Sequence, residues 1–426
     1  MAAPAAAPRD KQDILILAIV AGYAVAFILT GVAWADHKTV LNGITAILSS
    51  RDTLLTDYFG IAGIGASLVH TGILTLLACA TYYQTQARIT GASLACLFLL
   101  LGFGLFGKNL LNVWFIVIGV WSYARYRREP FRDHINTAFF GAALAPVVTE
   151  IMFSSTLSAS FRVPLALVVG LVISFSLPAV AAHLFQAHQG YSLYNVGFCA
   201  GVIGILVVAI LTSYGLVPEP VFIWTSGDNL RMGSMMGLMF SSLMTLGLGL
   251  DRRAMAKLGT LRRCTGQAPS DFIALAGLGA TLVNIGLIGL IALVYILAIG
   301  GDVNGPVMAG CLSVAGFGAF GKHPFNITPV MLGVVLGSLG KPWGLNDPAI
   351  QLAALFSTNL APIAGQFGWR WGTVAGFIHS SVALSVVGVH GGLNLYNNGF
   401  AAGLVACVLV PVIRSMKEGG SGREES

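Results

Sequence analysis

The chain has 426 residues, of which 56% are hydrophobic and only 9% are charged, and its mean hydropathy is +0.82. Soluble proteins carry about 25% charged residues, so these values exclude a soluble enzyme, a disordered protein and a nucleic-acid-binding protein. The formal net charge of +6 is therefore interpreted as basic loops on the cytoplasmic side of a membrane.

We predict an all-α integral membrane protein, because stretches of about 20 apolar residues, each sufficient to cross a bilayer as a helix, recur along the chain. The first stretch is expected to be a span and not a cleavable signal peptide, since it is long and no small-residue cleavage site follows it. About ten transmembrane helices are predicted, at residues 13–35, 58–83, 136–153, 163–186, 194–216, 231–250, 271–299, 349–366, 370–389 and 396–413.

Two further apolar runs, 91–121 and 306–339, are too long for one span and too short for two, and a Gly-Lys pair interrupts each of them. We predict that both are re-entrant segments, which enter the membrane and return to the same side. With a cytoplasmic N-terminus, the inner segments then hold 16 Lys and Arg and the outer segments five, as expected for cytoplasmic loops. Treating each run as a full span would place one of the two most basic loops outside.

The second half of the chain repeats the first. Three pairs of segments match, with eight identities in 16 positions, seven in 11 and nine in 14 respectively: 57–72 with 271–286, 102–112 with 316–326, and 188–201 with 390–403. Five predicted spans separate the starts of the two copies, and an odd number gives the copies opposite orientations. Inverted repeats of this kind are typical of transporters and channels, whose site lies near the membrane midplane at the repeat interface.

The repeat and the charged ends predict the organisation of the chain. Five regions are expected: a cytoplasmic N-terminal tail at 1–12, a first membrane repeat at 13–216, an extracytoplasmic linker at 217–230, a second membrane repeat at 231–413 and a cytoplasmic C-terminal tail at 414–426.

Lys108 and Lys322 follow the two interrupting glycines and are equivalent in the repeat. A charged side chain at the bilayer centre costs at least about 2.5–3.5 kcal/mol, so something must offset that cost. One interpretation is that the lysines attract an anion, or the oxygen of a polar solute, into a pore. The other is that each lysine caps the free carbonyls at the end of the preceding half-helix. Both interpretations remain open at this point.

Other polar pairs in equivalent or neighbouring positions are further candidates for a pore or solute-binding site. Asn112 and Asn326 lie four residues beyond the lysines, on the same helical face, and Asn109 and His323 directly follow the lysines.

Glu150 is an acid predicted inside a span, its counterpart is Gln366, and His70 aligns with Asn284. Ionisable groups inside a membrane are candidates for function, although a carboxylate can also pair with a lysine, and a lone histidine is often a packed, hydrogen-bonded residue. The candidate set also includes possible sites at Tyr194-Asn195 and Tyr396-Asn397, which open the last span of each repeat. For these the alternatives are interfacial anchoring by Tyr and helix capping by Asn.

Each half, with five spans and one re-entrant element after the second span, resembles the urea transporter family. The segments Gly-Tyr-Ser-Leu-Tyr-Asn at 190–195 and Gly-Leu-Asn-Leu-Tyr-Asn at 392–397 are loosely similar to the Gly-Tyr-Asn-Gly signature of that family, but its paired Asn-Pro is missing. The resemblance implies a pore on a pseudo-twofold axis and a homodimer or homotrimer. Over most of its length the chain also resembles an uncharacterised bacterial family of multipass membrane proteins, which implies the bacterial inner membrane as its location.

We therefore predict a channel or secondary transporter for a small polar solute, either a urea-like amide or a small anion, and not an enzyme. The chain lacks a Walker motif, which excludes direct ATP drive, and lacks HExxH or a nucleophile with its base. The six cysteines are scattered without metal-binding spacing, so no metal or cofactor is expected. The expected partners are the lipid bilayer and the solute, with no nucleic acid.

The alternative is a membrane subunit of a redox or other multiprotein complex without transport activity of its own. In layout the chain resembles the membrane subunit of sodium-pumping quinone reductases. The covalent flavin site of that family resembles Ser-Gly-Ala-Thr, whereas the nearest segment here, Gly-Leu-Gly-Ala-Thr ending at Thr281, lacks the serine.

Overall fold

The computed structural model describes residues 10–154 and 157–421. Their regular structure is helical apart from two short strands, β1 (Leu55–Thr56) and β2 (Phe222–Ile223), which pair in parallel. The predicted all-α class is thus confirmed. Most of the predicted tail at 1–12, and the end of the predicted tail at 414–426, lie outside the described residues.

The first half of the chain forms nine α-helices and two short 3-10 helices within the described ranges. They are α1 (Lys11–Trp34), α2 (His37–Leu48), α3 (Tyr58–Gln84), α4 (Gly91–Phe103), α5 (Asn112–Arg127), η1 (Phe131–Asp133), α6 (Ile135–Gly141), η2 (Ala142–Leu144), α7 (Ala145–Met152), α8 (Ala159–His188) and α9 (Asn195–Ser213).

The second half follows a similar order of α-helices, with α12 and α13 together in the place of α3. Its elements are α10 (Asn229–Leu250), α11 (Ala254–Arg262), α12 (Phe272–Ala276), α13 (Leu278–Ala298), α14 (Gly305–Gly316), η3 (Phe317–Ala319), α15 (Pro324–Leu339), α16 (Pro348–Ser357), η4 (Thr358–Leu360), α17 (Ala361–Phe367), α18 (Trp369–Ser385), η5 (Gly388–His390) and α19 (Asn397–Ser421). Even the irregularities agree, since α3 is kinked at Gly63 (φ +75°) and α12 is separated from α13 at Gly277 (φ +86°), the residue equivalent to Gly63.

Eight helical segments of the described chain are long and apolar enough to cross a membrane: Lys11–Trp34, Tyr58–Gln84, Ile135–Met152, Ser160–His188, Asn195–Ser213, Asn229–Leu250, Leu278–Ala298 and Asn397–Glu418. They correspond to eight of the ten predicted spans. The predicted span 349–366 is divided among α16, η4 and α17, and the predicted span 370–389 contains α18, which has 17 residues. Neither is among the eight, and of the two only α18 is shorter than the 18 residues of Ile135–Met152.

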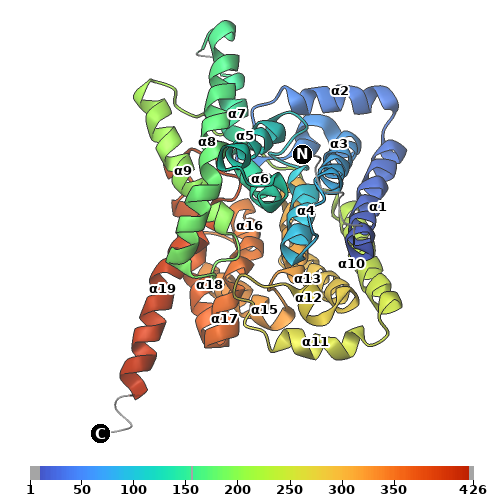
Figure 1. Cartoon of the computed structure of the whole chain (residues 1–426), viewed down its shortest axis with the longest axis vertical. Coiled ribbons are helices and arrows are strands. Elements are labelled where there is room, and N and C mark those ends of the chain that lie inside the picture. Colours follow the sequence, from blue (N-terminus) through green and yellow to red (C-terminus); the bar gives the residue numbers. More distant parts are fainter. Residues whose placement is uncertain (1–9, 155–156, 422–426) are drawn as a thin grey trace, which may run out of the picture.

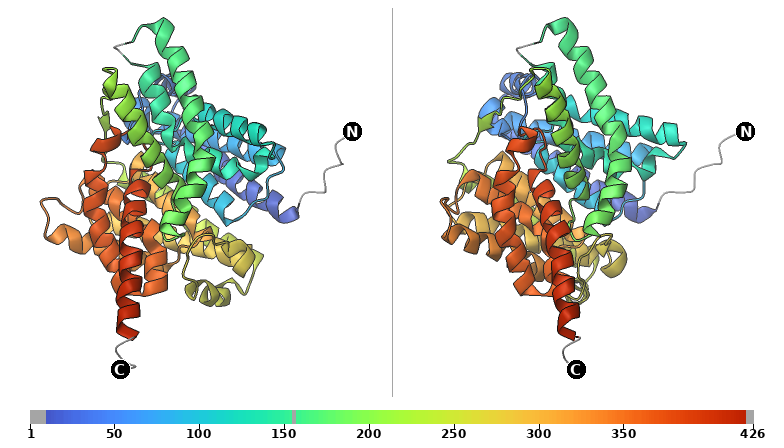
Figure 2. Two further views of the ribbon diagram at one scale, coloured as in Figure 1. Left: turned by 60° about the vertical axis from the view of Figure 1, so that its left-hand side comes forward. Right: turned by 90° about the vertical axis from the view of Figure 1, so that its left-hand side faces the viewer.

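Equivalent helices lie at opposite ends of the molecule. Figure 1 shows α2 across the top and the equivalent α11 across the bottom. Figure 2 shows α8 and α19, which are not equivalent in the repeat, extending beyond the rest of the chain in opposite directions. In the middle of the molecule, by contrast, equivalent helices contact each other, α4 with α14 and α9 with α19.

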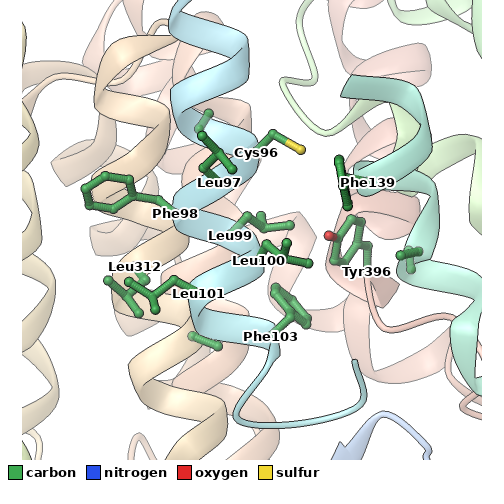
Figure 3. Packing of buried hydrophobic residues seen from close by; sticks show 14 of the residues in the cluster. Cys96, Leu97, Phe98, Leu99, Leu100, Leu101, Phe103, Phe139, Leu312 and Tyr396 are labelled. Carbon is green, nitrogen blue, oxygen red and sulfur yellow. The ribbon is translucent and has the colours of Figure 1, made fainter. Parts of the chain in front are cut away.

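These central contacts are close because small residues lie at them. A Cβ atom added to Gly102 of α4 would lie 2.7 Å from Cα of Ala309 in α14, and one added to Gly197 of α9 would lie 3.2 Å from Cα of Gly399 in α19. Such positions let helices approach closely in a membrane. Figure 3 shows Phe103 of α4 on the side that faces Tyr396. The two halves of the chain thus meet along α4, α14, α9 and α19.

Candidate functional site

The two Gly-Lys breaks form the same turn in each half. The first break joins α4 to α5, and the second joins η3 to α15. The glycine before each lysine has a positive φ, +76° at Gly107 and +116° at Gly321. A residue with a Cβ atom is strained in this region of backbone space, and glycine is not. The repeated glycines therefore allow the backbone to turn at each break.

Lys108 is fully buried. Its Nζ atom donates a hydrogen bond to the carbonyl oxygen of Phe139 at 3.0 Å and another to the hydroxyl oxygen of Tyr396. The ammonium group also lies 5.5 Å from the ring centroid of Phe103. Aromatic faces attract a cation at this distance. The first-half lysine is thus bound to a tyrosine of the second half.

Lys322 repeats this arrangement in the other half. It is fully buried, and its Nζ atom donates to the hydroxyl oxygens of Tyr194 and Thr358, at 2.7 Å each. The ring centroid of Phe317 lies 5.1 Å away. Each ammonium group therefore donates to a tyrosine hydroxyl and to one further oxygen atom. Neither donates to the last carbonyl groups of the preceding half-helix in the described structure.

Neither ammonium group has a carboxylate oxygen within 4 Å among the described residues. The buried carboxylate of Asp52 instead binds Asn109, the neighbour of Lys108. It accepts hydrogen bonds from the Tyr58 hydroxyl at 2.7 Å and from the side-chain amides of Asn109 and Asn112 at 3.0 Å each. The two lysines are therefore solvated by neutral dipoles, which leave a positive potential around them.

Asp52 lies between α2 and β1, outside the eight candidate spans. Burial raises its pKa from 3.8 to about 7, against the hydrogen bonds from Tyr58, Thr149 and Asn112, which lower it. Burial dominates because a charged carboxylate loses its hydration there. The residue equivalent to Asp52 at the offset of 214 is Gly266, so this acid exists in the first half alone.

Asn112 and Asn326 hold the breaks together. Their Oδ1 atoms accept from the backbone N–H of Asn109 at 2.9 Å and of His323 at 2.8 Å. Their Nδ2 atoms donate to the carbonyl oxygen of the glycine before each lysine, at 3.1 and 2.9 Å. Each asparagine thus closes the turn and caps the helix that follows it.

The side chains of His70 and Asn284 form hydrogen bonds with backbone groups at the two breaks. His70 Nε2 accepts from the backbone N–H of Leu110 at 3.2 Å, so Nδ1 is the donor to the carbonyl oxygen of Gly104 at 2.9 Å. The equivalent Asn284 Nδ2 donates at 2.8 Å to the carbonyl oxygen of Gly318. These side chains therefore support the loops, and they line neither of the two cavities described below.

The remaining polar pairs also have internal partners. His323 Nε2 bonds the carbonyl oxygen of Cys264 at 3.0 Å. Asn195 and Asn397 each bond the histidine that ends the preceding segment, at 2.9 Å in both halves, and a carbonyl oxygen of the preceding helix, at 3.0 and 2.8 Å respectively. These hydrogen bonds fix the turns that bring Tyr194 and Tyr396 to the centre of the molecule.

Glu150 and Gln366 lie away from the centre. Glu150 Oε1 accepts from the backbone N–H of Glu219 at 3.3 Å and lies 3.6 Å from the guanidinium group of Arg51. Gln366 is exposed near the end of α17. The structure therefore does not bring this pair together with the lysines.

Six aromatic rings surround the point where the two halves meet, and we call them the aromatic cluster. Its members are three equivalent pairs: Phe103 and Phe317, Phe140 and Phe356, and Tyr194 and Tyr396. The ring centroids of Phe103 and Tyr396 are 4.8 Å apart, and those of the equivalent Phe317 and Tyr194 are 4.6 Å apart. The arrangement in one half is thus reproduced in the other.

All six rings line a cavity of about 160 Å³, here called the central cavity. A second cavity of about 340 Å³, here called the side cavity, lies beside β1, β2, α16 and α18. Phe356, Leu395 and Asn398 line both. Of the described residues that line the central cavity, none is a lysine, so the ammonium groups lie behind the tyrosine rings.

The two cavities are related by the internal repeat. Ala268 and Phe320 line the central cavity, and the equivalent residues Leu54 and Phe106 line the side cavity. Phe320 precedes the second break, and Gly266, two residues before Ala268, packs against Gly321 in that break. Phe106 precedes the first break, and Asp52, two residues before Leu54, binds Asn109 in that break. The cavities therefore reach the aromatic cluster from the two opposite breaks.

The sequence interpretation missed several of these residues. Phe103 and Phe317 lie within the repeated Gly-Phe-Gly-x-Phe-Gly-Lys segment, which provided a signal for them. Asn398 replaces the Val196 of the first half, and its Oδ1 atom lies 3.0 Å from Nε2 of the buried His379. The internal repeat does not identify Asn398, because its residue type differs from that of Val196 and such differences are common between the two halves.

A protein-family model described as "Protein of unknown function (DUF1576)" matches residues 36–213 and 250–415. The two matched stretches begin at equivalent positions, 214 residues apart, and leave out α1 and most of α10. No curated protein and no solved structure matches the chain.

Proposed function

The chain belongs to the DUF1576 family, whose description names no activity. We propose that the protein is a membrane channel or secondary transporter for a small polar solute. The solute passes between the two halves, through the aromatic cluster. The observation that carries this proposal is the pair of cavities that reach the cluster from opposite breaks and share Phe356, Leu395 and Asn398.

The proposed topology is ten spans and two re-entrant segments in two inverted repeats. Equivalent helices α2 and α11 at opposite ends of the molecule support the inversion (Figure 1). The segment α16 to α17 has the same helix, 3-10 helix and helix order as α6 to α7, which supports a crossing there, and α18 then returns through the membrane. Both termini lie in the cytoplasm, and the expected location is a bacterial inner membrane.

The size and lining of the central cavity restrict the solute. A volume of about 160 Å³ holds a molecule of a few heavy atoms beside water, and a lining dominated by aromatic rings favours a solute that loses its water shell at modest cost. A small amide or a small anion fits these conditions. By analogy with urea-transporter-like folds, we expect each protomer of a homodimer or homotrimer to hold its own pore.

The test is solute flux into proteoliposomes, measured with urea, acetamide, sodium formate and sodium nitrate in separate assays. We expect at least one solute to enter at least about tenfold faster than into protein-free liposomes. The variant Asn398→Phe adds a ring where the two cavities meet and is expected to reduce that flux by about tenfold or more, equivalent to about 1.4 kcal/mol or more of added barrier.

The matched control is Val408→Phe, which places the same ring on a residue of α19 that is 69% exposed and is expected to leave the flux unchanged. Equal thermal unfolding midpoints of the two variants would show that Asn398→Phe is folded. If no solute enters faster than into empty liposomes, the transport proposal is wrong. The alternative, a subunit of a multiprotein complex, would then be pursued by isolation of the intact assembly.

A further inference from the structure

The hydroxyl group of Tyr396 is oriented by its lysine. An ammonium group has donors but no lone pair, so the Tyr396 oxygen must accept the hydrogen bond from Lys108. Its own O–H is then left to donate, and the described residues offer it no hydrogen-bond acceptor. Tyr396 itself lines the central cavity.

Tyr194 repeats the arrangement. Its oxygen accepts from Lys322 at 2.7 Å, and its ring lines the central cavity. The Oγ1 atom of Thr358 accepts from the same ammonium group and stands beside the tyrosine hydroxyl. Two lysine–tyrosine pairs, each formed between the two halves, thus place an ammonium group behind each tyrosine ring of the one cavity.

Asn398 supplies another donor at the place where the cavities meet. Its Oδ1 atom is engaged by His379 Nε2 at 3.0 Å, and its backbone carbonyl oxygen accepts from Asn359 Nδ2 at 3.4 Å. The Nδ2 group of Asn398 has no hydrogen bond in the part of the chain that the structure describes. Its two N–H donors are therefore free beside the cavity.

Acceptors are scarce in the same lining. None of the described residues that line the central cavity is a carboxylate, and the Oδ1 atom of Asn195 is already engaged by His188 at 2.9 Å. An amide solute would bring N–H groups that lack side-chain acceptors here, and each buried unpaired donor costs about 1–3 kcal/mol. A cation would be repelled by two lysines that have no carboxylate within 4 Å.

We infer that the central cavity binds a small monovalent anion, held by the hydroxyl of Tyr396 and the side-chain amide of Asn398 and attracted by Lys108 and Lys322. The inference rests on the proposed transport function and specifies its solute class. A divalent anion is disfavoured, because the dehydration cost of an ion rises with the square of its charge and the lining offers few donors. Formate, nitrate and halides have the required charge and size.

The experiment combines binding and transport on the full-length protein. Binding is measured by the thermal unfolding midpoint in detergent, with increasing sodium nitrate, formate or chloride and with sodium gluconate as the ionic-strength control. Transport is measured by anion-dependent membrane potential in proteoliposomes. We expect nitrate, formate or chloride to raise the midpoint in a saturable way, whereas gluconate, urea and acetamide do not.

The variants distinguish the loss of a lysine or a hydrogen-bond donor from a general loss of structure. Tyr396→Phe keeps the ring and removes the hydroxyl, and is expected to weaken anion binding about tenfold or more, the value of a hydrogen bond to a charged group. The control Tyr295→Phe removes a buried hydroxyl that has no partner in the described structure and lies away from the cavity, so binding should not change. Lys108→Met together with Lys322→Met should abolish anion binding.

The outcomes distinguish the inference from the function on which it rests. Flux of urea or acetamide without anion flux or anion binding would overturn the anion site and retain the transport function. Saturable anion binding without flux of any solute would support the site and overturn transport. The lysine variants carry a risk of misfolding, so Tyr396→Phe is the second, independent test of the anion site. Unchanged anion affinity in that variant would contradict the inference.

Discussion

The two buried lysines are stabilised by neutral oxygen atoms, and this choice of partner decides their electrostatic effect. A carboxylate beside each lysine would cancel its charge, whereas the carbonyl of Phe139 and the hydroxyls of Tyr396, Tyr194 and Thr358 do not. Hydrogen bonds and aromatic faces offset part of the cost of burial.

The buried acid of the first half has a different arrangement. Asp52 accepts from Tyr58, Asn109 and Asn112, and burial raises its pKa to about 7. In an unfolded chain its pKa is near 3.8. The folded state therefore binds more protons than the unfolded state between these values, so stability falls as the pH rises through this window.

The prediction concerns Asp52→Asn, which removes this titration. The thermal unfolding midpoint of the wild-type protein should fall relative to that of the variant as the pH rises from about 5 to about 8. The control is Asp251→Asn, because Lys257 and the backbone N–H of Arg253 lower the pKa of Asp251, so its titration lies below this range and its difference from wild type should stay constant. A rise of the wild-type midpoint relative to Asp52→Asn would contradict the assigned direction.

At the scale of elements, the two breaks are built from the same short set of residues. Gly107 and Gly321 allow the turn through their positive φ, and Asn112 and Asn326 close it. The start of the partner helix lies against each break, since a Cβ atom added to Gly91 of α4 would lie 2.0 Å from the carbonyl oxygen of Ala319. Each break is thus held by the half-helix of the other repeat.

We predict that Gly321→Ala destabilises the protein by at least about 2 kcal/mol, because a non-glycine residue at a positive φ stores about 1–3 kcal/mol of strain and its Cβ atom would lie 2.4 Å from the carbonyl oxygen of Gly266. The measurement is chemical or thermal unfolding in detergent. Gly22→Ala in α1 is the control, since no atom lies within 4 Å of its added Cβ, and a gain of up to about 1 kcal/mol is expected there. Equal stability of both variants would exclude strain at the break.

In the molecule as a whole, the buried lysine of each half donates a hydrogen bond to a tyrosine of the other half. Lys108 binds a residue 288 positions away, and Lys322 binds one 128 positions away. These contacts follow from the pairing of α4 with α14 and of α9 with α19. Under the proposed inverted topology, the two breaks approach the aromatic cluster from opposite sides of the membrane.

The inverted topology predicts the sides on which α2 and α11 lie. In a cysteine-free background, Lys38→Cys in α2 should react with a membrane-impermeant thiol reagent added outside intact cells, because the proposed topology places α2 outside the cytoplasm. Ala256→Cys in α11 should react only after the membrane is opened. Both residues are exposed in the structure, so each cysteine is its own accessibility control after permeabilisation. Reaction of both from the same side would contradict the inversion.

The membrane class, the repeat and the positions of the breaks could all be predicted from the amino-acid sequence. These properties follow from apolar length, from matches at a constant offset and from Gly-Lys pairs, all of which are local along the chain. The sequence also identified Lys108 and Lys322, because a charge inside an apolar run is visible without a structure.

The surroundings of those lysines became known from the three-dimensional packing of the helices. The structure assigned Asn112, Asn326, His70 and Asn284 to the support of the breaks, and it brought Tyr194 and Tyr396 to the lysines of the opposite halves. The sequence could not make this choice, since an amide that caps a turn and an amide that faces a cavity have the same local pattern. Which of the two it does depends on helix packing between residues far apart in the chain, and that packing also forms the central cavity.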